Sequence, residues 1–160
     1  MSILAGNKMP SGSFSVMTES GPSQVFTDKL FSGKKVVLVS VPGAFTPTCS
    51  KGHLPGYINL ADDLREKGVD TIACMAVNDV FVMHAWGKDR EVGDKVMMLA
   101  DGNAEYAKAL GLDFDASAHG MGVRGQRFAI VVEDGVATHV AIEAAGEFDV
   151  SKAESILGTL

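Results

Sequence analysis

The sequence predicts one α/β domain in which helices flank a mixed central sheet. Three observations support this fold class. Apolar runs typical of buried strands alternate with segments of helical periodicity from residue 35 onward, Asp134-Gly135 joins two β-type runs near the C-terminus, and no linker, repeat or low-complexity tract divides the chain. We therefore expect a single domain over residues 1–160, with a sheet that is parallel at first and antiparallel at its end.

Strand and helix segments open this pattern. Residues 35–41 are β-branched and almost continuously apolar, as in a strand buried on both faces, and Pro42 ends them. Apolar side chains at spacings of three and four then predict a helix over 48–67 in which Pro55 causes a bend. A second buried strand is predicted over 69–77. This order places a turn between the first strand and the first helix.

The rest of the chain continues the alternation and then becomes rich in strands. Asn78-Asp79 offers a capping side chain for a helix in which Trp86 and its apolar neighbours form a core stripe. Gly111 ends a later helix, and Asp134-Gly135 is a strong signal for a hairpin turn. In chain order, the remaining predicted elements are a strand at 96–99, a helix at 104–110, strands at 127–133 and 136–142, a loop at 144–146 and a helix at 151–157.

The composition restricts the classes of function. The chain carries a net charge of -6 and no basic run longer than Lys34-Lys35, which argues against binding to nucleic acid or to an anionic membrane. No segment approaches the roughly 18 to 20 apolar residues that a membrane span needs, so we expect a cytoplasmic protein. Only Cys49 and Cys74 are cysteines, unlike the dense pattern of a disulfide-stapled domain, and at least one should have a chemical role.

The turn after the first strand, residues 42–50, carries the clearest chemical signal. Ligand sites of open α/β sheets gather at such turns, and two prolines and a glycine make this one rigid. Cys49 falls in the first helical turn, where unpaired N–H groups and the positive end of the helix dipole favour a thiolate. Thr46 can place a hydroxyl beside the sulfur. Locally, Cys49 is either a nucleophile or a buried structural cysteine, and Thr46 either serves the site or caps the turn.

Several functions are compatible with a reactive Cys49. His53 is four residues later on the same predicted helix, a spacing that suits a metal pair, a Cys–His dyad or an ordinary polar position. The other histidines are scattered, so we expect no metal site, and no flavin, haem or nucleotide fingerprint indicates a cofactor. A thiol peroxidase, a cysteine hydrolase and a redox sensor or partner-binding module remain as alternatives.

A longer motif favours the peroxidase. The spacing Pro42-x-x-x-Thr46-x-x-Cys49 resembles the active-site signature of peroxiredoxins, and residues 50–57 extend the similarity to the atypical type-five, or plant type-two, subfamily. Segments that also resemble this subfamily follow in its order at 77–86, 122–127 and 131–135. The resemblance covers nearly the whole chain. It implies a thioredoxin-like fold and a thiol-dependent peroxidase that reduces hydrogen peroxide and alkyl hydroperoxides through a sulfenic acid.

The resemblance also implies roles for individual residues. Cys49 is expected to be the peroxidatic cysteine, Thr46 to hydrogen-bond the peroxide, Pro42 to shield the site, and Arg124 to stabilise the thiolate and the polarised O–O bond. His53 is expected at the edge of the site, near the peroxide entrance. Such donors make physical sense, because attack by sulfur on one peroxide oxygen places negative charge on the other.

Two further features of the sequence bear on which arginine enters the site. Arg124 and Arg127 are three residues apart on a β-like segment and should point to opposite faces, so that one enters the site while the other pairs elsewhere. Gly125 stands where the subfamily commonly has serine, which removes a hydroxyl that could help hold this loop.

The second half of the reaction needs a thiol that reduces the sulfenic acid. Cys74 is the only internal candidate, although its apolar strand equally suits a core position. The resemblance leaves both interpretations open, because some members pair a cysteine at this position with the first one and others leave it unpaired. No cysteine follows Cys74, so we expect glutathione with glutaredoxin, or thioredoxin, as the reductant. The resemblance further implies a homodimer formed through loops around the active site.

Overall fold

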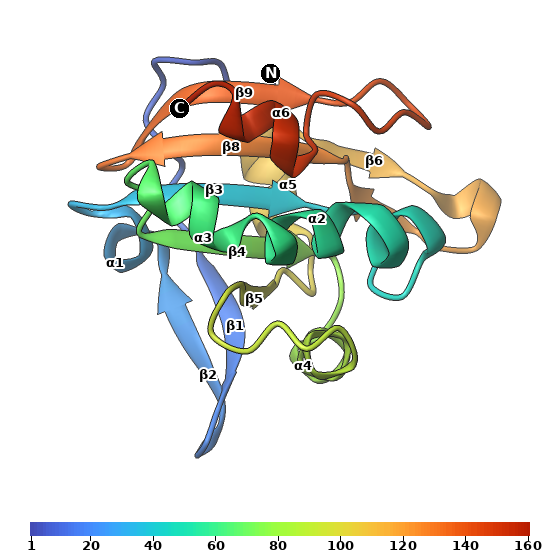
Figure 1. Ribbon diagram of the computed structural model, residues 1–160. Coiled ribbons are helices and arrows are strands. Elements are labelled where there is room, and N and C mark those ends of the chain that lie inside the picture. The colour runs from blue at the N-terminus through green and yellow to red at the C-terminus, as the bar shows by residue number, and fades with distance from the viewer.

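A computed structural model describes all of residues 1–160, which form a seven-stranded mixed sheet with helices on both faces (Figure 1). The strand order is β2-β1-β5-β4-β3-β8-β9. The strands are β1 (Ser13–Thr18), β2 (Gly21–Phe26), β3 (Lys35–Ser40), β4 (Thr71–Ala76), β5 (Met97–Ala100), β8 (Phe128–Glu133) and β9 (Val136–Ile142). This confirms the predicted α/β class with its mixed sheet.

The parallel centre consists of β3, β4 and β5. The four valine and leucine side chains from Val36 to Val39 are at most 1% exposed, because β3 lies between two strands and both sheet faces are covered. Continuous apolarity, rather than alternation, is the pattern that such burial requires. The sequence therefore identified the buried centre of the sheet correctly.

The antiparallel end of the sheet follows from one turn. Asp134 and Gly135 both have positive φ, 48° and 79°, which a two-residue hairpin with right-handed strand twist needs. This turn joins β8 to β9, and β8 returns antiparallel beside β3. In that pairing Phe128 lies opposite Ser40, so the start of β8 and the end of β3 meet at the same edge.

The helices cover the two faces unequally. Buried side chains of α2 (Leu54–Asn59), α3 (Ala61–Glu66), α4 (Val80–Asp89) and α6 (Ala153–Leu157) share one core cluster, and Figure 1 shows α2, α3 and α6 along that face. The opposite cluster contains α1 (Thr27–Phe31) and α5 (Glu105–Leu110). Asp79 caps α4 and Gly111 ends α5, as predicted. None of these helices has the length and apolarity to span a bilayer.

The predicted helix over 48–67 is in fact three segments. A π-helical turn over Cys49–His53 precedes α2, and α3 begins again after Leu60. Pro55 lies in the first turn of α2, so the prediction of a single helix bent at Pro55 was wrong. A proline has no N–H and crowds the carbonyl four residues earlier, here that of Lys51, and the wider π-turn avoids this contact.

The sequence analysis missed the elements that the central sheet does not need. The β1–β2 hairpin adds a second antiparallel edge through Ser15 and Ala100, and α1 follows it. A small separate sheet joins β6 (Asp113–Asp115) to β7 (Val123–Gly125), with a 3-10 turn at Ser117–His119. β2 opens with Gly21-Pro22 and is mostly exposed, and β6 has a single apolar residue, so their hydrophobic pattern is weak.

Candidate active site

The loop that leaves β3 carries Cys49 into the interior. Cys49 is the first residue of the π-helical turn and its side chain is 0% exposed. Both Cys49 and Cys74 are free thiols in one core cluster. A buried sulfur can hold negative charge only where a donor or a cation faces it.

Arg127 supplies that cation. Its Nη2 donates to Cys49 Sγ at 3.2 Å. Arg127 directly precedes β8, whose first residue pairs with the last residue of β3, so the sheet brings its side chain to the loop of Cys49. The contact joins an always protonated guanidinium to the sulfur and favours the thiolate.

Arg124 does not make this contact, which corrects the expectation drawn from the sequence. Its Nε donates to the carbonyl of Met121 at 2.9 Å and its Nη1 to that of Pro42 at 3.4 Å. Arg124 lies on β7, outside the main sheet, and packs against Gly43. Arg124 instead contacts the loop before Cys49 through the Pro42 carbonyl, and the arginine at the sulfur is Arg127.

His53 is not at the edge of the site, as had been expected, but behind it and 0% exposed. Its Nδ1 lies 2.9 Å from Arg127 Nη1 and its Nε2 lies 3.1 Å from the carbonyl of Ser151. An arginine can only donate and a carbonyl can only accept, so these partners assign the neutral imidazole with its hydrogen on Nε2. Burial, and then the charge of Arg127, lower the pKa of His53 from 6.5 to about 3.

This placement bears on the alternatives for Cys49. Because Nδ1 of His53 accepts from Arg127 and Nε2 donates to a carbonyl, neither nitrogen is free to take a proton from the thiol or to bind a metal. The chain contains no group of three or more His, Cys, Asp or Glu side chains that could hold a metal ion. The geometry is therefore not that of a Cys–His dyad.

The loop before Cys49 is held in a defined shape. Phe45 has a positive φ of 64°, Asn78 Oδ1 accepts from Ala44 N at 2.9 Å, and Thr46 Oγ1 donates to the carbonyl of Gly43 at 2.7 Å. A hydroxyl has one hydrogen and two lone pairs, so Thr46 Oγ1 is left as an acceptor. It can then receive the O–H of a small substrate.

Two residues that the sequence analysis did not connect with the site hold the turn itself. Trp86 Nε1 donates to Ser50 Oγ at 2.9 Å, and Arg90 Nη1 donates to the carbonyl of Ser50 at 3.1 Å. Ser50 is adjacent to Cys49, so α4 anchors the π-helical turn from the side. A polar serine beside the cysteine and a tryptophan on the neighbouring helix were the signals available in the sequence.

A pocket of about 380 Å³ adjoins the site. Arg127 connects it to Cys49, because the same side chain lines the pocket and donates to the sulfur. The lining residues are Pro42, Thr48, Phe114, His119, Gln126, Arg127 and the segment 143–147. A larger groove of about 530 Å³ between the β1–β2 hairpin and α4 has no cysteine or arginine in its lining.

Fold and site together define a class. At the end of β3 a thioredoxin-like sheet places the buried Cys49, with the Arg127 guanidinium at its sulfur and the Thr46 hydroxyl as an acceptor in the preceding turn. These groups are typical of a thiol-dependent oxidoreductase.

Comparisons with known proteins identify the family. Residues 4–157 match the Redoxin family. Peroxiredoxin-2B of Arabidopsis thaliana is 46% identical over 159 residues, which cover 99% of this chain and 98% of that protein. Reduced Prx3 of Vibrio vulnificus, solved in complex with H2O2, is 50% identical, with a TM-score of 0.95 and 98% of each chain covered. Peroxiredoxin 5 from Alvinella pompejana is 34% identical, with a TM-score of 0.87 and coverage of 98% and 97%.

The chain belongs to the redoxin family and, within it, to the peroxiredoxins. Its activity is the thiol-dependent reduction of peroxides. Its fold is the thioredoxin-like fold of these enzymes.

Variants that lack one guanidinium distinguish the role of Arg127 from that of Arg124. Arg127→Gln should lower the second-order rate constant for hydrogen peroxide by about a hundredfold or more, as expected when one preorganised donor at a developing charge is lost. Arg124→Gln loses contacts to carbonyls only and should lower it by less than about tenfold. Stopped-flow mixing of the reduced proteins with peroxide measures both constants. A greater loss in Arg124→Gln contradicts the placement of Arg127.

The buried neutral His53 predicts a pH dependence of stability. Its pKa falls from 6.5 in the unfolded chain to about 3 in the fold, so the unfolded state binds the extra proton within this window. The free energy of unfolding should therefore fall as the pH drops from 6.5 towards 3, with a limiting slope of about 1.4 kcal/mol per pH unit.

Urea denaturation at pH 7 and pH 5 tests this dependence. His53→Gln should lose less stability between the two pH values than the wild type, whereas His84→Gln, at an exposed position, should behave as the wild type. An unchanged pH dependence in His53→Gln would show that another group is responsible.

Proposed function

We propose that Cys49 is the peroxidatic residue and that Arg127 and Thr46 hold the peroxide against it. The observation that carries this proposal is the 3.2 Å hydrogen bond from Arg127 to Cys49 Sγ inside a buried site. The thiolate attacks one oxygen, an S–O bond forms, and the O–O bond breaks. The departing oxygen takes both electrons of that bond and then a proton, so the products are Cys49 sulfenic acid and water or an alcohol.

Each donor has a place in this step. The guanidinium has five N–H groups, two of which contact His53 and Cys49, so others remain for the peroxide oxygens. Thr46 Oγ1 donates its hydrogen to the Gly43 carbonyl, so it can accept a hydrogen bond from the peroxide O–H. Negative charge that develops on the departing oxygen then meets fixed donors without further reorganisation.

Pro42 and Arg124 support the loop rather than the sulfur. Pro42 lines the pocket beside Arg127 and is half-buried, which suits the proposed shielding of the site. Arg124 donates to the Pro42 carbonyl and packs on Gly43, so it fixes the loop that carries Thr46. We expect hydrogen peroxide and small alkyl hydroperoxides as substrates, because the proposed donors hold only the O–O group and the adjoining pocket leaves room for a small substituent.

An external thiol is the proposed reductant. Cys74 lies in the middle of β4, between β3 and β5, and is 1% exposed. Burial, and then the neighbouring Cys49, raise the pKa of the Cys74 thiol far above its usual range. A protonated thiol inside a central strand is a poor attacker of sulfenic acid. Glutathione with glutaredoxin, or thioredoxin, therefore fits better than an internal disulfide.

Cysteine variants test both halves of this proposal. Cys49→Ser should abolish hydroperoxide consumption, whereas Cys74→Ser should retain the wild-type rate, within about twofold, with an external thiol system. Steady-state assays with glutathione plus glutaredoxin and, separately, with thioredoxin identify the reductant. Loss of turnover in Cys74→Ser, with sulfenic acid formation intact, would instead make Cys74 the resolving residue.

We also propose a homodimer that forms through the loops around the site. Phe45, whose ring packs near Trp86, is 52% exposed, and Phe81 on α4 is 63% exposed. Exposed aromatic side chains near a functional loop are typical of a protein contact. Sedimentation velocity at micromolar concentration should give a dimer that Phe81→Ser weakens. Phe26→Ser, on the edge strand β2, is the matched control and should leave the dimer unchanged. A monomeric wild type contradicts this proposal.

A further inference from the structure

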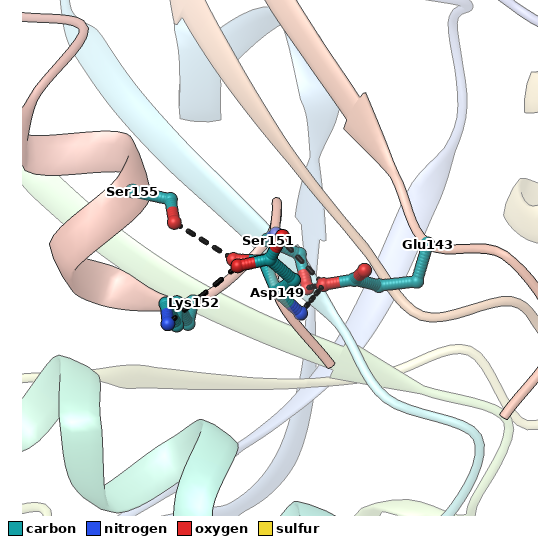
Figure 2. A network of polar contacts seen from close by, with 5 residues as sticks. All are labelled: Glu143, Asp149, Ser151, Lys152 and Ser155. Carbon is teal, nitrogen blue, oxygen red and sulfur yellow. Dashed lines mark hydrogen bonds and ion pairs between the residues drawn. The ribbon is translucent and has the colours of Figure 1, made fainter. Parts of the chain in front are cut away.

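Glu143 is a buried carboxylate that the peroxide step does not use. It directly follows β9 and is 7% exposed. Its Oε2 accepts from Asp149 N at 2.7 Å, from Ser151 N at 2.8 Å and from Ser151 Oγ at 2.7 Å (Figure 2). Burial opposes the negative charge, but these hydrogen bonds outweigh it and lower the pKa of Glu143 below its usual value. One carboxylate oxygen therefore fixes the segment before α6.

The same segment presents a carbonyl to the active site. The Ser151 carbonyl accepts from His53 Nε2 at 3.1 Å and from the Tyr57 hydroxyl at 2.6 Å. The Ser151 N–H and hydroxyl point to Glu143 while its carbonyl points to His53. Ser151 thus links the carboxylate to the imidazole through a single residue.

The imidazole passes this constraint to Arg127. His53 Nδ1 accepts from Nη1 of the guanidinium whose Nη2 donates to Cys49 Sγ. Phe148, in the segment that Glu143 holds, packs with its ring centroid 5.2 Å from that of His53 and 5.7 Å from Cζ of Arg127. The backbone N–H of Glu143 also donates to the Arg127 carbonyl at 3.0 Å. The residues around Glu143 therefore contact Arg127 from its backbone to its guanidinium.

We propose that Glu143 is a positioning residue for peroxide reduction. It holds the Ser151 carbonyl where that group orients His53, and His53 aims the Arg127 guanidinium at Cys49 Sγ. This inference rests on the roles proposed above for Cys49 and Arg127. If the segment moves by a fraction of an ångström, His53 loses its hydrogen bond to the Ser151 carbonyl. The imidazole can then rotate or change tautomer, and Nδ1 no longer accepts from Arg127.

Glu143→Gln tests the relay. The amide oxygen can take the place of Oε2, but a neutral oxygen accepts the three hydrogen bonds more weakly than a carboxylate, so the segment should be held less firmly. We expect the second-order rate constant for hydrogen peroxide to fall by about tenfold to a hundredfold. Asp149→Asn is the matched control, because its exposed carboxylate pairs only with Lys152.

Ser151→Ala gives a milder version of the same test. It removes one of the three donors to Glu143 and keeps both the N–H and the carbonyl of residue 151. A folded Ser151→Ala protein with a rate constant lowered by about twofold to fivefold supports the relay. A wild-type rate constant in a folded variant, whether Glu143→Gln or Ser151→Ala, overturns it.

A double-mutant cycle separates positioning from general loosening of the fold. If Glu143 acts through Arg127, then Glu143→Gln should change the rate by less than about twofold in an Arg127→Gln background. A loss of the same factor in both backgrounds overturns the relay, although the roles of Cys49 and Arg127 stand. Wild-type activity of Arg127→Gln alone would instead refute the proposed role of Arg127 and the relay with it.

Discussion

The site depends on the hydrogen bond from Arg127 Nη2 to Cys49 Sγ. The Cys49 sulfur is 0% exposed, and a negative charge on a buried sulfur needs a charged donor beside it. Arg127 is the only side chain that donates a hydrogen bond to this sulfur. The guanidinium needs its own acceptor in the same interior, and a protonated histidine could not provide one. The bond between Arg127 and Cys49 thus requires a neutral His53 with its hydrogen on Nε2, and the lowered pKa of His53 keeps the imidazole neutral.

The topology of the sheet explains why these groups meet. β3 ends at Ser40 and β8 begins at Phe128, and these two residues are paired in the antiparallel ladder. The loop to Cys49 and the side chain of Arg127 therefore leave the sheet at the same edge, although 78 residues separate them in the sequence. Peroxide reduction needs both a nucleophile and a cation. The pairing of β3 with β8 brings the segments that carry Cys49 and Arg127 together, whatever the conformation of the loops that follow.

The sequence predicted the parts whose signals are local. Continuous apolar runs identified β3 and β4, Asp134-Gly135 identified the hairpin, and the motif around Thr46 and Cys49 identified the reactive turn. It failed where the answer depends on contacts between distant segments. Spacing predicted that Arg124 and Arg127 point to opposite faces, but it could not tell which one contacts the sulfur. Helical spacing likewise could not reveal that His53 is buried between Arg127 and Ser151.

Trp86 provides a direct test of Cys49 as the residue that peroxide oxidises. It is the only tryptophan, and its indole donates to Ser50, the neighbour of Cys49, so its fluorescence should report oxidation of the sulfur. Reduced protein would be mixed with hydrogen peroxide without any reductant, and sulfenic acid would be trapped and mapped by mass spectrometry. We predict a fluorescence change whose rate rises linearly with peroxide and whose product is trapped at Cys49. Oxidation mapped first to Cys74, or no peroxide-dependent change, would contradict it.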